Sequence, residues 1–328
     1  MKGLLGKNIW RIIVIFLVLY LLRFVLPQSF VMEVVIGGIY VLGCSFLIGR
    51  IGLVSFGQPV YLALGAYGTA FYLYYWGTNP YIGILMGILV GLVVSSLIGA
   101  LLVRLSSSYF TLSNLAFCAI GFFMFQKVLV DYTHGDNGLW FLSRMDATPV
   151  FDLSTTDGVF NFAFIVAVSV WFLFDYLMDQ SIFGATCLAV KINEEKLKFL
   201  GYNTFRIKWF AFVIANTVTA LAGSIYAIYL GFVSAGISDV SKAVEPVAIS
   251  MLGGAGNLFG PIAGVFLFTA LKDIASQIIS YWELMVGLLL VAIMLGGEKG
   301  IVPFLESLVQ KLVNSLRNKN LSSVSKGV

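Results

Sequence analysis

Long apolar runs separated by short polar connections dominate the pattern of this chain. Several of these runs are long enough to cross a bilayer, which takes an α-helix of roughly 20 residues. The predicted spans are residues 9–26, 31–49, 81–103, 109–130, 159–178, 209–230 and 282–295. With shorter apolar pieces counted as broken or half helices, the pattern predicts an all-α polytopic membrane protein with about 8–10 transmembrane helices.

Two apolar stretches are interrupted by glycine, proline and an amide side chain. The first break is SFGQP, residues 55–59, and the second is LGGAGNLFGP, residues 252–261. Interruptions at matching positions of two halves indicate a transport pathway and predict two-fold pseudo-symmetric halves, whereas close helix packing through small residues is the alternative. We assign the broken-helix geometry to Gly57, Pro59, Gly253, Gly254, Gly256 and Pro261. The candidate pathway side chains are Gln58, Tyr67, Glu245 and Asn257.

The longest charged interval between two apolar blocks contains the features of a short, capped helix. Asn193 can cap the first turn, with Glu194 and Glu195 at the positive end of the helix dipole, Lys198 near the negative end and Gly201 as a left-handed stop. Ile192, Phe199 and Leu200 would share one apolar face. The stretch is therefore predicted to dock on a partner in the aqueous phase, and an ordinary solvated loop is the alternative.

Charge distribution predicts the orientation of the chain. Hydrophobic residues make up 59% and charged residues 11% of the sequence, whereas a soluble domain has about a quarter charged residues. The net charge of +4 reflects basic residues clustered in a few loops, which the positive-inside rule explains without nucleic-acid binding. We expect a single transmembrane domain over residues 1–328. Both termini, the loop 179–208 and the basic tail 297–328 would be cytoplasmic, and the loop 131–158 would face outward.

The chain contains few of the side-chain arrangements that catalysis or metal binding requires. Its three cysteines lack metal-ligand spacing, and His134 is the single histidine. No Ser-His or Cys-His arrangement and no paired carboxylates within spans are visible, and no phosphate-binding GxxxxGK[ST] loop occurs. We therefore expect no metal, no cofactor and no enzymatic activity in this chain.

Several motifs resemble the membrane subunits of ABC importers for branched-chain amino acids, a family that also includes urea and short-amide importers. They occur in family order through most of the chain. HGDNGL at residues 134–139 is similar to the outer-loop TGGxxGL of the family, although His134 and Asp136 stand where small residues are common. The other matching stretches are GLVSFGQPVYLALGAYGTA (52–70), TLSNLAFCAIG (111–121), residues 191–227 and LGGAGNLFGPIAG (252–264).

This resemblance implies a function and a set of partners. Residues 193–201 are similar to the coupling helix that inserts into the ATP-binding subunit, although Lys191-Ile192-Asn193-Glu194 replaces the usual Arg-Glu-Asn run. The coupling residues would be Asn193, Glu194, Glu195, Lys198, Leu200 and Gly201. The implied partners are ATP-binding cassette subunits, a second homologous permease in a heterodimer, an extracytoplasmic solute-binding protein and the lipid bilayer. The implied location is the inner or plasma membrane of a prokaryote.

The expected activity is import of a small polar solute by alternating access, with branched-chain amino acids as the leading substrates. Urea or a short amide is the alternative substrate. A channel or facilitator that works without partners is a further alternative, but a channel has no reason to retain a docking helix. An intramembrane enzyme is the remaining hypothesis, and the sparse catalytic groups speak against it.

Overall fold

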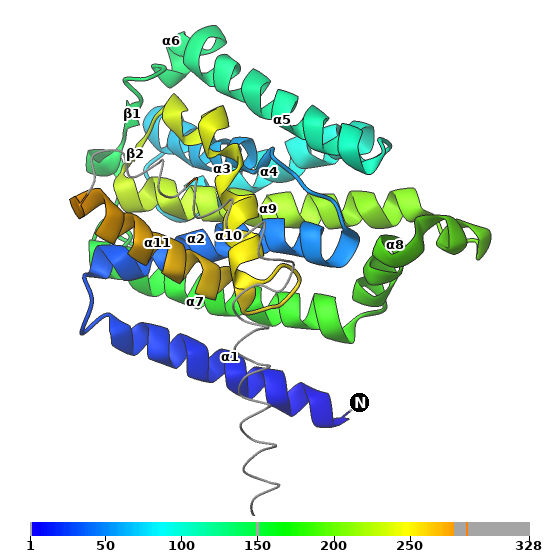
Figure 1. The fold of residues 1–328 in the computed structure, drawn as a ribbon. Coiled ribbons are helices and arrows are strands. Elements are labelled where there is room, and N and C mark those ends of the chain that lie inside the picture. Colours follow the sequence, from blue (N-terminus) through cyan, green and yellow to red (C-terminus); the bar gives the residue numbers. More distant parts are fainter. Residues whose placement is uncertain (1, 149–150, 279–286, 288–328) are drawn as a thin grey trace, which may run out of the picture.

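The computed structural model describes residues 2–148, 151–278 and 287, and this part of the chain is almost entirely helical (Figure 1). The predicted span 282–295 and the tail 297–328 lie outside the described residues, apart from residue 287. The helices are α1 (Lys2–Leu22), α2 (Gln28–Phe46), α3 (Gln58–Phe71), α4 (Pro80–Leu102), α5 (Ser107–Phe123), α6 (Val130–Thr133), α7 (Thr156–Asp175), α8 (Ile182–Phe199), α9 (Thr204–Leu230), α10 (Glu245–Gly253) and α11 (Gly260–Ile278).

Five described helices are long and apolar enough to cross a membrane, and they confirm the prediction of an all-α polytopic membrane protein. These helices, with the wider π-type turns that end three of them, are Gln28–Ile51, Pro80–Leu102, Ser107–Val128, Thr156–Gln180 and Thr204–Leu230. Ile9–Leu22 is a shorter apolar helix. Each long helix lies within a few residues of a span predicted from the sequence.

Side-chain caps mark where four of the described helices begin. Asn79, Thr155, Ser181 and Asn203 each accept a hydrogen bond from a backbone N–H group in the first turn of α4, α7, α8 and α9. Such caps satisfy donors that a helix start leaves without an intrahelical partner. The polar residues between the apolar runs therefore fix the helix starts as well as the connections.

The helix α9 is the centre of the bundle and packs against α2, α3 and α4. Glycines allow this close contact: a Cβ atom on Gly65 of α3 would lie 1.9 Å from the carbonyl oxygen of Ala220 in α9. In the reverse direction, a Cβ atom on Gly223 would lie 1.9 Å from the carbonyl oxygen of Leu62. The small residues after the first break thus pack one backbone directly on another, as small-residue helix contacts in membranes do.

The outer faces of the bundle are apolar. Only 28% of the most apolar stretch of α4 and 22% of that of α5 is buried, and the exposed side chains include Leu89, Leu97 and Ile120. A soluble protein rarely exposes such a surface, whereas lipid covers it without cost. These helices therefore present their apolar faces to the bilayer or to another membrane protein.

The two ends of the bundle differ in structure. The amino end of α1 and the helix α8 lie at one end in Figure 1, and α6 and the strands lie at the other. There β1 (Leu139–Trp140) pairs antiparallel with β2 (Phe232–Val233), which joins the connection 131–158 to the segment after α9. We call these the α8 end and the strand end.

Candidate functional site

The segment predicted to dock is the second half of α8. The helix is interrupted at Asn193, whose backbone is extended (φ −161°, ψ 97°) and whose Oδ1 atom accepts a 2.9 Å hydrogen bond from the backbone N–H of Lys196. Residues 193–201 therefore form a separate capped helix that continues from the first half of α8 at an angle. We call this segment the docking helix.

The docking helix ends in a Schellman motif. Gly201 has a φ of +86°, its N–H donates to the carbonyl of Lys198 at 3.0 Å, and the N–H of Tyr202 donates to the carbonyl of Leu197 at 3.3 Å. This pair of bonds satisfies carbonyls that a helix end leaves free, and glycine adopts the left-handed conformation without a Cβ penalty. Both ends of the segment are thus fixed by local chemistry.

Glu194 fastens the docking helix to α9. Its carboxylate lies 3.0 Å from the Lys198 ammonium in the i,i+4 pair and 2.9 Å from the Lys208 ammonium, and it accepts a hydrogen bond from the Thr204 hydroxyl at 3.1 Å. Partial burial acts to raise the pKa of Glu194, but hydrogen bonds from Lys208, Lys198 and Thr204 outweigh it, so the pKa lies below its ordinary value of 4.5. The carboxylate is therefore ionised at neutral pH.

Three apolar side chains lie exposed in and beside the docking helix, one before Asn193 and two at its carboxyl end. Ile192, Phe199 and Leu200 are 77%, 90% and 73% exposed, whereas Leu197 is buried and anchors the helix. Glu195 is exposed among them. Exposed apolar side chains on a helix that is capped at both ends are suited to contact with another protein.

The first break lies between the end of α2 and the start of α3. Gly57 precedes α3 and Pro59 lies in its first turn, where a missing N–H is tolerated. A Cβ atom on Gly57 would lie 3.0 Å from Oδ1 of Asn114 in α5. Gln58 is fully buried, and its Oε1 atom accepts a 2.8 Å hydrogen bond from the Thr219 hydroxyl of α9.

The second break separates α10 from α11. Gly254 and Gly256 have φ values of +102° and +86°, and a Cβ atom on Gly253 would lie 1.9 Å from the carbonyl oxygen of Gly260. The Asn257 side chain accepts a 3.0 Å hydrogen bond from the backbone N–H of Phe259. Pro261 stands in the first turn of α11. Asn257 therefore stabilises the turn that leads into α11.

The four candidate pathway side chains lie in different surroundings. Tyr67 is buried in the core, with its ring stacked on Phe125 at 4.5 Å between centroids. Glu245 lines a hollow of about 120 Å³ with Glu33 and Lys272, and neither Gln58 nor Tyr67 lines it. The structure thus brings the docking residues together and leaves the pathway candidates spread over several elements.

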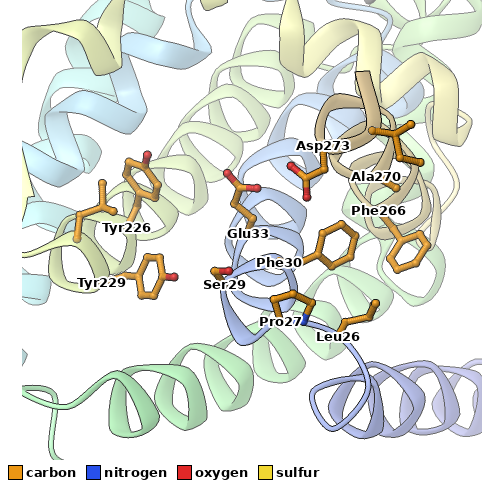
Figure 2. Close-up of a pocket in the computed structure, with 12 residues that line it drawn as sticks. Leu26, Pro27, Ser29, Phe30, Glu33, Tyr226, Tyr229, Phe266, Ala270 and Asp273 are labelled. Atoms are coloured by element: carbon orange, nitrogen blue, oxygen red, sulfur yellow. The ribbon is translucent and has the colours of Figure 1, made fainter. Parts of the chain in front are cut away.

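A larger cavity lies at the strand end, between α2, α9 and α11 (Figure 2). Its volume is about 610 Å³, within the range of small-molecule sites. Figure 2 shows the carboxylates of Glu33 and Asp273 facing one hollow, with the rings of Tyr226 and Tyr229 across it. The other lining residues that the figure labels are Leu26, Pro27, Ser29, Phe30, Phe266 and Ala270.

Both charged side chains that line this cavity are acidic. Lys272 lies 3.7 Å from the outer carboxylate oxygen of Glu33 but lines the smaller hollow next to the cavity. The cavity therefore favours a positively charged group against its carboxylates and an apolar group against its aromatic walls. The sequence does not bring these carboxylates together, because residues 33 and 273 meet only through the packing of α2 on α11.

A polytopic helical bundle with a capped polar helix at one end and a cavity at the other is the architecture expected of a membrane permease. Comparison with known proteins then identifies the family. The model of the permease component of branched-chain amino acid transport systems matches residues 26–294. The chain belongs to this family of permease components, which confirms the resemblance seen in the sequence.

Named relatives agree with this family. The chain is 25% identical over 290 residues to the high-affinity branched-chain amino acid transport system permease protein LivM of Salmonella typhimurium, and 25% identical over 291 residues to LivM of Escherichia coli. Each match covers 80% of this chain and 66% of the LivM protein, so the chain spans somewhat less than two thirds of these relatives. A shorter match, 30% identical over 127 residues and covering 36% of each chain, is to the autoinducer 2 import system permease protein LsrC of Yersinia pseudotuberculosis. No solved structure matches the chain.

Proposed function

We propose that this chain is the permease subunit of an ATP-driven importer that moves branched-chain amino acids into the cytoplasm by alternating access. The observation that carries the proposal is the docking helix, 193–201. It is capped by Asn193, closed by Gly201 and fastened to α9 through Glu194 and Lys208, and it exposes Phe199 and Leu200 to solvent. A channel that works alone has no use for such an element.

The partners follow from the position of this helix and from the family. ATP-binding cassette subunits would receive Ile192, Phe199 and Leu200 in a cleft and would hydrolyse ATP, while this chain conducts the solute. A second homologous permease would complete the pathway as a heterodimer. A solute-binding protein would deliver substrate at the strand end. In this arrangement the α8 end and both termini face the cytoplasm, and the protein lies in the inner or plasma membrane of a prokaryote.

The cavity at the strand end supports an amino acid rather than a neutral amide as substrate. Glu33 and Asp273 would attract an ammonium group, and Phe30, Phe266 and the tyrosine rings would cover a branched apolar side chain. Urea has neither a positive charge nor an apolar branch, so it would gain little from this lining. The similarity to the LivM proteins supports the same substrate class.

The test is uptake of labelled leucine and labelled urea into proteoliposomes that contain this chain with its co-purified partners. We expect leucine uptake that requires ATP and is lost when Glu195→Lys is combined with Gly201→Pro, although the permease still inserts and folds. Uptake of urea alone would overturn the substrate. Uptake without ATP or partners, unchanged by the double substitution, would overturn the importer and favour a facilitator.

A further inference from the structure

The end of α2 lies against α8. The Lys191 ammonium, two residues before the cap of the docking helix, donates a 2.9 Å hydrogen bond to the carbonyl oxygen of Gly49. Its stem crosses Gly52, where an added Cβ atom would lie 3.1 Å from Cγ of Lys191. Gly52 has a φ of +79° and ends the π-type turn Leu47–Ile51. The first half of α8 therefore holds the last turn of α2 by a charge-assisted bond.

A second cation holds the same turn to the end of α7. Arg50 donates a hydrogen bond to the carbonyl oxygen of Met178 at 3.0 Å and forms an ion pair with Asp179 at 2.5 Å. The Arg50 side chain is 18% exposed and the Asp179 side chain 39%, so the pair lies at the surface with its cation half-buried. The turn 47–52 is thus fixed to the elements on both sides of the connection that leads into the docking helix.

The opposite side of this turn contacts the second break. Gly49 packs directly on Gly256, since a Cβ atom on Gly49 would lie 2.0 Å from Cα of Gly256. The N–H of Gly256 also donates to the Ser45 hydroxyl at 3.3 Å. A further bond joins α7 to the same loop, from the Trp171 indole N–H to the carbonyl oxygen of Leu258 at 3.0 Å. With no side chain between Gly49 and Gly256, a shift of Gly49 toward the second break displaces the backbone of Gly256.

We propose that the end of α2, residues 45–52, transmits movement of the docking helix directly to the second break, with Lys191 and Arg50 as the positioning residues. The inference rests on the proposed function and names the route that couples ATP hydrolysis to transport. When the ATP-binding subunits move the docking helix, Lys191 and Arg50 keep the turn 47–52 in contact with α8 and α7. Gly49 then displaces the loop around Gly256, and the junction of α10 and α11 shifts.

The proposal is tested in the full transporter by Lys191→Met, with Lys191→Arg as the conservative variant. A third variant, Arg104→Gln, removes a cation near the α8 end that contacts Phe205 and none of residues 45–52. ATP hydrolysis and leucine uptake are measured in the same proteoliposomes. We expect Lys191→Met to keep ATP hydrolysis and to lower leucine transported per ATP by about tenfold, a size of effect typical of coupled sites. Lys191→Arg should restore most of the ratio, and Arg104→Gln should keep it.

A conformational measurement separates transmission from a merely structural role. Ala255→Cys places a thiol in the second break for a fluorescent label, and Cys44, Cys118 and Cys187 are fully buried and protected from labelling. ATP binding should change the fluorescence in the otherwise unchanged chain and not in Lys191→Met. An unchanged fluorescence response or an unchanged transport ratio in Lys191→Met would overturn the proposal. Absence of ATP-dependent uptake in the unchanged chain would instead overturn the proposed function.

Discussion

Glu194 joins the docking helix to the membrane bundle through two side chains of α9, Thr204 and Lys208. Its carboxylate is 32% exposed, whereas the Lys208 side chain that it pairs with is only 10% exposed. Removal of the carboxylate leaves the Lys208 ammonium in a place with little access to water. The loss of stability on removing the Glu194 carboxylate should therefore lie between that for breaking a surface ion pair and that for breaking a buried one.

We expect Glu194→Gln to lower the free energy of unfolding by about 2 kcal/mol, an estimate between those two limits. Thermal unfolding in detergent measures the effect. Lys208→Met, which removes the charge and keeps the stem, should cost less, and the double variant should cost less than the sum of the two single variants. Strict additivity would show that the ion pair contributes nothing.

The same carboxylate predicts how stability depends on pH. The pKa of Glu194 in the folded chain lies below its ordinary value of 4.5 because of the bonds from Lys208, Lys198 and Thr204. The contribution of the Glu194 carboxylate to the free energy of unfolding should be fully present above pH 4.5. It should be lost as the pH falls through the lower pKa of the folded chain. The difference in Tm between the unchanged chain and Glu194→Gln should shrink below that pH. A difference that grows on acidification would contradict the assignment.

Sequence alone identifies only part of this residue network. Glu194 and Lys198 are four residues apart on one helix, so their pairing follows from helical spacing. Lys208 is 14 residues from Glu194, and its contact depends on where α9 begins and on the angle of the chain after Gly201. The one available signal is a lysine in the first turns of an otherwise apolar span, where an isolated charge needs a partner.

At the scale of elements, the docking helix depends on its ends more than on its length. It has few residues, and isolated helices of that length are unstable in water. The cap at Asn193 and the left-handed Gly201 satisfy its end groups, and Leu197 anchors it to the bundle. These local features can be predicted from the sequence, because capping residues and stop residues act on their nearest neighbours.

Gly201→Ala should loosen this helix. A Cβ atom there meets nothing within 4 Å, so the cost is confined to the backbone at φ +86° and should be about 1 kcal/mol. Hydrogen exchange of the amides of residues 194–202 should become faster. Gly201→Asn is the matched control, and because asparagine tolerates the left-handed conformation it should exchange more slowly than Gly201→Ala. Equal exchange in all three proteins would contradict the role of the motif.

The contact between α3 and α9 tolerates an added side chain less well than Gly201 does. Gly65→Ala would place a Cβ atom 1.9 Å from the carbonyl oxygen of Ala220, and we expect a loss of roughly 3 kcal/mol because backbone must move. The control is Gly83→Ala, where the nearest atoms are side-chain atoms of Leu73 and Thr69 at 3.3 Å. Thermal unfolding should separate the two variants clearly. Similar Tm values would show that α3 and α9 can move apart freely.

At the scale of the whole molecule, the helical class of the fold follows from the length of the apolar runs. The close packing of α9 on α3 does not, because it depends on which glycines face each other after folding. The cavity at the strand end is likewise beyond sequence reasoning, since Glu33, Tyr226 and Asp273 come from three helices. Glycine and proline at the two breaks do mark where α2, α3, α10 and α11 end or begin, because both residues act locally.

The molecule is thus organised along one axis, with a docking helix at the α8 end and an acidic, aromatic cavity at the strand end. The helices α7, α8 and α9 join the docking helix to the bundle, and the turn 47–52 lies between α8 and the second break. Under the proposed route, a partner bound to the docking helix would act on the second break through this turn. The proposed import activity requires that ATP-binding subunits bind the docking helix.

The most direct test of that claim is co-purification of ATP-binding subunits with Phe199→Ser combined with Leu200→Ser. Both side chains are exposed and make no contact that holds the bundle, so the permease should insert and fold normally. The control is Ile182→Ser, which removes an equally exposed apolar side chain, 83% exposed, at the other end of α8. We predict that the double variant loses its ATP-binding subunits and its ATP-driven leucine uptake while the control keeps both. Retention of both by the double variant would contradict the account.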